Sequence, residues 1–187
     1  METVEDILLE AEDKMDKAVE FLHQEFNGLR TGKASPSLVE NVTVDYYGSA
    51  TRLKELAGIA TPEPRLIVIN PYDPSALSAI EKAILAANVG VTPMNDGRVI
   101  RVPIPELSEE RRKELLKVAK RMCEDQRVAI RNIRRESNDV IKDLQKGGKI
   151  SEDERDGGLD EIQTLTDKHI KTIDDMLTAK EADVMEV

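Results

Sequence analysis

The sequence is poor in the residues that covalent catalysis, metal binding and base stacking most often use. Its 187 residues include one cysteine, two histidines, two phenylalanines, three tyrosines and no tryptophan. Because Cys123 is the only cysteine, no intrachain disulfide can form and no cysteine cluster can hold a metal. The few aromatic rings argue against a base-stacking platform of the kind that single-strand binders use. Cys123 itself falls among apolar helix positions, so we expect a buried structural thiol.

The sequence also lacks segments that would address or anchor it to a membrane. No apolar run approaches the roughly 18 residues that span a bilayer. The first residues are acidic and resemble neither a signal peptide nor a transit peptide. These observations predict a cytoplasmic protein without membrane contact.

Catalytic motifs are missing as well. There is no glycine-rich phosphate loop, no HExxH pair and no nucleophile elbow. His23 and His169 fall in helical segments, and a packed structural histidine is the simpler interpretation of each. We therefore expect that the protein is not an enzyme and needs neither a cofactor nor a metal.

Charge is sorted along the chain despite a net charge of −10, which alone would argue against nucleic acid as a partner. Residues 111–146 carry twelve bases against six acids, whereas residues 1–30 carry nine acids against three bases. Residues 151–187 carry twelve acids against four bases. One basic segment between acidic ones can create a local positive field on an acidic protein.

Three stretches have the apolar spacing of amphipathic helices: residues 3–30, residues 108–146 and the chain from Ser151 onward. Thr3 can cap the first helix, Ser108 the second, and Ser151 with Glu154 forms a capping-box pair for the third. Helices of this length, each apolar on one face, should pack as a bundle. The glycines at 147–148 make the second and third helices antiparallel neighbours.

The stretch between the first two helices has strand and turn signals instead. Residues 42–48 and 65–70 favour strands, and residues 95–98 have the sequence of a hairpin turn. Asp73-Pro74 should open a helix that runs to about Ala87. We therefore predict an α+β protein of two domains. Residues 1–30 plus 106–187 form the antiparallel three-helix bundle, and residues 31–105 form an inserted, mostly β domain.

One helix face is typical of a phosphate-binding surface. Arginines at i, i+4, i+7 and i+8 fall within about 100° on a helical wheel, opposite the apolar stripe. This arginine ridge should point outward, where guanidinium groups can bind an RNA backbone. A solvated face balanced by nearby acids, or arginines paired with acids on the other two helices, remains open as an alternative. The ridge consists of Arg127, Arg131, Arg134 and Arg135.

Several stretches, in order along nearly the whole chain, resemble the ribosome recycling factor family. One is the run from Arg30 to Leu38, with Lys33 where arginine is common, and another is the ridge itself. His169 departs from the family pattern, which favours an apolar or aromatic residue there. The remaining matches are Tyr46-Tyr47-Gly48, Ile100-Arg101-Val102-Pro103 and Glu109-Glu110-Arg111-Arg112-Lys113.

The resemblance implies an L-shaped monomer hinged at about 30–32 and 103–105. It implies that the bundle binds large-subunit ribosomal RNA on the post-termination ribosome. Elongation factor G, with GTP, would then drive the insert so that the subunits separate and ribosomes, mRNA and tRNA are recycled. The expected RNA contacts are Arg112, Arg131 and Arg134 first, then Arg127 and Arg135; the expected hinge residues are Arg30, Thr31, Gly32, Pro103 and Pro105.

Three other functions compete with this one. A helical adaptor or chaperone could bind a basic protein through the acidic helices, and neutralising the ridge should then leave binding intact. An enzyme with its active site in the insert would need a pocket with polarised acids. A factor that stalls or hibernates ribosomes would bind them without splitting them.

Overall fold

The chain folds into two compact units, each described here by itself. The structure is a computed structural model that describes residues 3–186. One unit is built from the N-terminal segment up to Arg30 and the segment from Glu109 onward. The other is the stretch between them, Thr31–Ser108. None of the helices within residues 3–186 is long and apolar enough to cross a bilayer.

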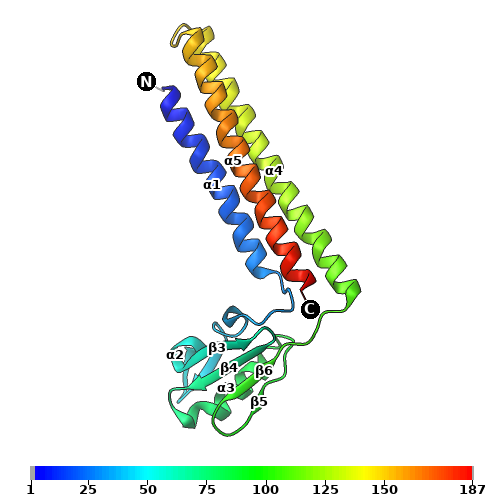
Figure 1. The fold of residues 1–187 in the computed structure, drawn as a ribbon. Helices are drawn as coiled ribbons and strands as arrows, with labels where there is room; N and C mark the ends of the chain where they lie inside the picture. Colours follow the sequence, from blue (N-terminus) through cyan, green and yellow to red (C-terminus); the bar gives the residue numbers. More distant parts are fainter. Residues whose placement is uncertain (1–2, 187) are drawn as a thin grey trace. The chain divides into compact units, whose positions relative to one another are not determined.

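The first unit is a bundle of three long helices: α1 (Val4–Gly28), α4 (Glu109–Lys146) and α5 (Glu152–Met185). Each packs against both others, and α1 and α5 run antiparallel to α4 (Figure 1). A short turn joins α4 to α5, and Gly148 there has a φ of +70°, which a residue with a side chain rarely adopts. The three-helix bundle predicted from the apolar spacing is confirmed.

Capping boxes begin two of these helices at the predicted residues. The Asp6 backbone N–H donates to the Thr3 hydroxyl at 3.2 Å, and the Thr3 N–H donates to the Asp6 carboxylate at 3.0 Å. Ser151 and Glu154 make the same reciprocal pair, at 3.1 and 2.7 Å. These bonds satisfy amide groups that have no partner inside the helix, so both predicted caps are confirmed.

The bundle core is apolar, with one buried histidine. Cys123 is fully buried, and burial raises the pKa of its thiol to about 11, so it is a structural thiol as predicted. His169 is 3% exposed. Its Nε2 lies 2.7 Å from the Asp16 carboxylate on α1, and its Nδ1 lies 2.7 Å from the Leu165 carbonyl oxygen. The predicted packing of His169 at a helix seam is confirmed.

The second unit contains two antiparallel sheets. A two-stranded sheet pairs β1 (Thr43–Tyr46) with β2 (Ser49–Arg52). The second sheet has the strand order β3-β4-β6-β5, and all its pairs are antiparallel. Its strands are β3 (Ala57–Glu63), β4 (Leu66–Pro71), β5 (Met94–Asn95) and β6 (Ile100–Pro103). The helical segments are η1 (Pro36–Leu38), α2 (Leu53–Leu56), η2 (Pro74–Ala76) and α3 (Leu77–Ala86).

The core of this unit lies where α3 packs with alternate residues of β4 and β6. Ile67 and Ile69 of β4 are fully buried, as are Ile80 and Ile84 of α3. The hairpin turn predicted at 95–98 is confirmed between β5 and β6. The helix expected directly after Asp73 begins later, because Asp73 caps the short turn η2 through a 2.9 Å bond from the Ser75 N–H.

The turn between β1 and β2 contains an uncommon backbone conformation. Tyr47 and Gly48 both have positive φ, +51° and +79°, as a two-residue turn of this twist requires. Gly48 adopts this conformation freely, whereas a residue with a side chain costs about 1–2 kcal/mol there. The Tyr47 side chain is 81% exposed.

Candidate nucleic-acid interface

All five arginines predicted to bind RNA lie on α4. The helix forms because its apolar residues recur at helical spacing, and seven of its residues, from Leu115 to Leu144, are buried in the bundle. Arg112 precedes Arg134 by 22 residues, which is about 33 Å along the axis and about 40° around it. A row of cations with this reach could follow an RNA strand over several phosphates.

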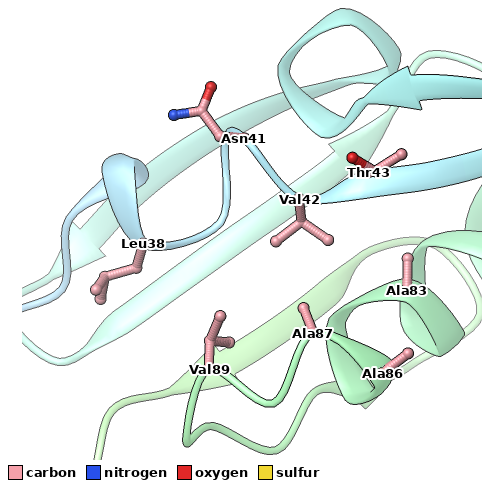
Figure 2. A pocket seen from close by; sticks show the side chains of 8 residues that line it. All are labelled: Leu38, Asn41, Val42, Thr43, Ala83, Ala86, Ala87 and Val89. Atoms are coloured by element: carbon pink, nitrogen blue, oxygen red, sulfur yellow. The ribbon is translucent and has the colours of Figure 1, made fainter.

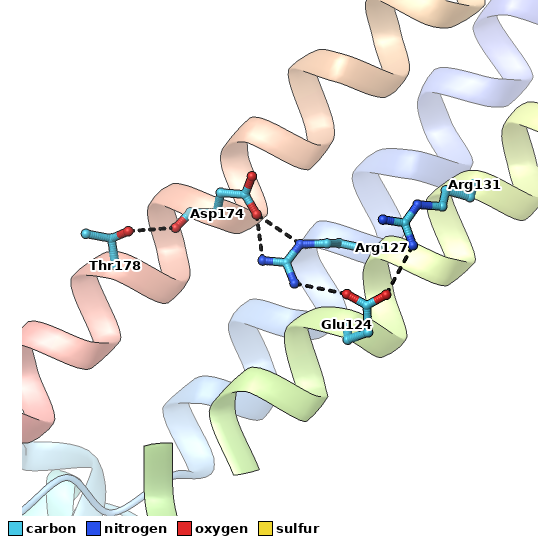
Figure 3. A network of polar contacts seen from close by, with 5 residues as sticks. All are labelled: Glu124, Arg127, Arg131, Asp174 and Thr178. Atoms are coloured by element: carbon cyan, nitrogen blue, oxygen red, sulfur yellow. Dashed lines mark hydrogen bonds and ion pairs between the residues drawn. The ribbon is translucent and has the colours of Figure 1, made fainter. Parts of the chain in front are cut away.

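Arg127 departs from the outward-pointing ridge predicted from the sequence. Only 17% of its side chain is exposed. Its Nε and Nη2 both donate to Asp174 Oδ1 on α5, at 2.9 and 2.6 Å, and its Nη1 donates to Glu124 at 3.2 Å (Figure 3). The prediction that this residue faces solvent is therefore wrong. The spacing was read correctly, but Arg127 sits at the edge of the apolar stripe, where its guanidinium reaches the neighbouring helix.

Arg131 is more open and is held by one carboxylate. Its side chain is 41% exposed, and Nη1 donates to Glu124 Oε1 at 3.1 Å. Glu124 thus bridges Arg131 and Arg127 with its two oxygens (Figure 3). Hydrogen bonds from Arg131, then from Arg127, lower the pKa of the Glu124 carboxyl, so it stays ionised at neutral pH.

The remaining arginines are more loosely held. Arg134 makes one long hydrogen bond, 3.4 Å from Nη1 to the Gln163 side-chain oxygen on α5. Arg135 is exposed and Arg112 is half-buried. Within residues 3–186, neither Arg112 nor Arg135 makes a hydrogen bond or ion pair. Exchange of water for phosphate at these positions would break no protein contact apart from the weak one to Gln163.

Sequence reasoning missed the partner that holds Arg127. An antiparallel pair joined near residue 149 places residue 127 opposite about residue 171. Asp174 lies within one turn of that position, so this arithmetic would have pointed to the pair. The possibility that ridge arginines pair with acids on the third helix is confirmed for this one residue.

The residues expected to form a hinge lie where the chain passes between the units. Arg30 follows the end of α1, and Gly32 has a φ of +80° with the Leu107 side chain 3.1 Å from where a Cβ would be. Pro103 is the last residue of β6 and is paired opposite Leu66. The Ile104 N–H also bonds to Arg65 at 2.8 Å, so the sheet extends almost to Pro105.

The insert has a hollow of about 520 Å³ between the chain before β1 and the end of α3. Figure 2 shows Val42 pointing toward the end of α3, where the small side chains of Ala83 and Ala87 lie. Asn41 and Thr43 are the only polar side chains in the lining, and none of the lining residues titrates. The hollow therefore offers no acid or base for catalysis.

Comparison with known proteins decides the family. The model of the family described as ribosome recycling factor matches residues 22–185. The chain belongs to the ribosome recycling factor family. The ribosome-recycling factor of Carboxydothermus hydrogenoformans is 56% identical over 98% of this chain and 100% of its own length. That of Geobacillus sp. is 54% identical over the same shares of the two chains.

Solved structures of the family have the same fold. A solution structure of a ribosome recycling factor matches with a TM-score of 0.78 and 45% identity, covering 100% of both chains. The T. thermophilus ribosome recycling factor, in models with E. coli elongation factor G bound to the E. coli post-termination complex, matches with a TM-score of 0.66. It is 40% identical over 99% of this chain and 100% of its own. The resemblance and the predicted α+β fold class are confirmed.

Proposed function

We propose that this protein acts in the cytoplasm as a monomer that binds the post-termination ribosome. With elongation factor G and GTP it splits the ribosome into subunits, so that ribosomes, mRNA and tRNA can be used again. Family membership supports ribosome recycling, and the T. thermophilus relative is described on a post-termination complex together with elongation factor G. The steps driven by GTP are the part that experiment has to establish.

The observation that carries the RNA-binding part is the state of the arginines on α4. Arg134 and Arg135 project from a helix with a surplus of bases, in a chain whose net charge is −10. RNA phosphates would be attracted to this face and repelled by the acidic helices α1 and α5. Affinity would then depend on one orientation of the bundle rather than on general attraction.

The structure suggests different roles for the arginines. We assign Arg112, Arg131, Arg134 and Arg135 to large-subunit ribosomal RNA. Arg127 would have to release both Asp174 and Glu124 before it could bind phosphate, so we assign it to holding α4 against α5. Arg131 must exchange Glu124 for phosphate, which makes its contact weaker than its position on the helix implies.

The insert would move against the bundle about the two connections at 30–32 and 103–105. Only two covalent links join the units, and Gly32 lies in one of them with a backbone conformation open mainly to glycine. Such links permit rotation of one unit relative to the other. Gly32→Val should therefore reduce splitting more than it reduces binding to large subunits.

Light scattering of post-termination ribosomes tests the proposal as a whole. Mixed with this protein, cognate elongation factor G and GTP, the ribosomes should lose scattering as the subunits separate. Omission of any one component should abolish the loss. Ribosomes that bind the protein but keep their scattering would indicate a stalling factor, and no binding would indicate the adaptor function.

A further inference from the structure

The Tyr46-Tyr47-Gly48 motif has no part in the RNA interface. All three tyrosines of the chain lie in the insert, at positions 46, 47 and 72. The rings of Tyr46 and Tyr47 meet edge to face, with centroids 4.7 Å apart. The Tyr46 hydroxyl donates to Asp73 at 2.7 Å, and the Tyr47 hydroxyl lies 3.1 Å from the Ser75 hydroxyl. The β1–β2 turn is thereby tied to η2.

Folding does not account for a tyrosine at position 47. Its ring is 81% exposed, so it adds little to the core. Its φ of +51° lies in the left-handed region, where glycine or asparagine would be favoured over tyrosine. Tyr72, next to Asp73 in the chain, is 73% exposed. Rigidly held, exposed tyrosines are characteristic of binding surfaces, because they offer large contact area at little entropic cost.

The charges beside these rings select the partner. Asp45 and Asp73 flank them, and residues 40–51 and 66–80 contain no lysine or arginine. Hydrogen bonds from Tyr46 and then Ser75 lower the pKa of Asp73, which keeps its carboxylate charged at neutral pH. Aromatic faces beside carboxylates attract arginine and lysine through cation–π and ionic contacts. The same carboxylates repel RNA phosphates.

We propose that Tyr47, Tyr72, Asp45 and Asp73, here called the tyrosine patch, dock a protein segment that presents arginine or lysine. The setting, a ribosomal recycling complex, rests on the proposed function. The chemistry of the patch does not depend on it. An RNA partner stacking its bases on Tyr47 is the competing outcome of the test.

The free protein can be tested by NMR, because five Phe and Tyr rings give a simple aromatic spectrum. The probe is a capped Gly-Arg-Gly-Arg-Gly peptide, and its control has glutamine in place of arginine. The arginine peptide should shift the Tyr47 ring resonances to saturation, and the glutamine peptide should not. Equal responses to both peptides, no response, or tighter binding of a short oligouridylate would overturn the proposal.

Matched variants localise the effect. Asp45→Asn keeps a side-chain oxygen for the Gly48 N–H, which Asp45 binds at 2.9 Å, but removes the charge; the peptide Kd should rise about fivefold. Tyr47→Asn should fold at least as well as wild type, because asparagine tolerates the left-handed backbone, yet shift no ring of the patch. Leu85→Gln, at a 55% exposed position on α3, should bind the peptide as wild type does. A uniform response of all three variants would overturn the proposal.

Ribosome assays separate this inference from the proposed function. Tyr47→Asn should bind large subunits normally but split post-termination ribosomes about fivefold more slowly. Arg134→Ala should instead weaken large-subunit binding. Unchanged splitting by Tyr47→Asn, or a binding loss equal to that of Arg134→Ala, would overturn the docking role. If the wild type fails to split ribosomes, the proposed function fails, and the peptide titration still decides about the patch.

Discussion

The bundle and the insert use their surfaces in opposite ways. The bundle spreads an apolar core along three helices, and its candidate interface is one straight face of α4 that carries positive charge. The insert concentrates its core between a small sheet and α3, and its candidate interface is a turn with tyrosines and carboxylates. One protein can thus offer phosphate-binding and cation-binding surfaces on separate units, so a low net charge does not describe what either unit binds.

The largest effect expected concerns the separateness of the two cores. Ile69 is fully buried in the insert, and Ile69→Ala should destabilise that unit by about 2–5 kcal/mol. Residue-resolved amide hydrogen exchange should show faster exchange in β4 and β6 and unchanged exchange in α4 and α5. Ile130→Ala, at a fully buried bundle position, is the reciprocal variant. Equal acceleration of both units by either variant would show that they unfold together.

Arg127 and Arg134 should separate stability from binding. Arg127→Ala removes hydrogen bonds to Asp174 and Glu124, and should lower the free energy of unfolding of the bundle by about 1–3 kcal/mol. Arg134→Ala removes only a long bond to Gln163 and should change it by about 0.5 kcal/mol or less. Urea unfolding followed by circular dichroism measures both. A stable Arg127→Ala variant that binds ribosomes poorly would return Arg127 to the RNA-contact group.

The helix caps should contribute more than a serine that makes no cap bond. Ser151→Ala removes the bond from the Glu154 N–H and should cost about 1 kcal/mol. Ser35 precedes η1 but makes no capping hydrogen bond, so Ser35→Ala is the control in the insert. Thermal melts monitored separately in the two units compare them. A loss from Ser35→Ala as large as that from Ser151→Ala would contradict the assignment of the cap.

The smallest effect expected is on acid stability. Hydrogen bonds from Ser151 lower the pKa of the Glu154 carboxyl from its ordinary value of 4.5. Its stabilisation is therefore present above pH 4.5 and lost as the pH falls through the lower, folded value. Glu154→Gln, which keeps an oxygen for the Ser151 N–H, should flatten the stability of the bundle against pH below about 4.5. An unchanged acid slope in pH-dependent melts would indicate that the cap bond is not formed in solution.

The two units also differ in how far their sequences predict them. The bundle could be predicted because caps and apolar spacing are local signals, so Thr3 and Ser151 mark true helix starts. The insert could be predicted only where a turn or a hydrophobic strand stands out. Strand β3 contains glycine, alanine and proline, and forms because it pairs with β4, which no local pattern reveals.

The candidate site shows the same limit. Spacing placed four arginines on one face of α4, but did not say that Arg127 would reach Asp174, 47 residues later, across the helix pair. Pairing between helices depends on their relative rotation, which sequence periodicity fixes only to within part of a turn. The positive φ of Tyr47 was equally hidden, because the Tyr-Gly sequence is an uncommon choice for such a turn.

The most direct test of the central claim is the salt dependence of binding to isolated large ribosomal subunits, with Arg134→Ala beside Arg127→Ala. If Arg134 neutralises a phosphate, its loss should lower the slope of log affinity against log salt by about 0.7–0.9. Arg127→Ala, corrected for its stability, should keep the wild-type slope. An unchanged slope for Arg134→Ala would contradict the account, because the exposed arginines of α4 would then bind no RNA.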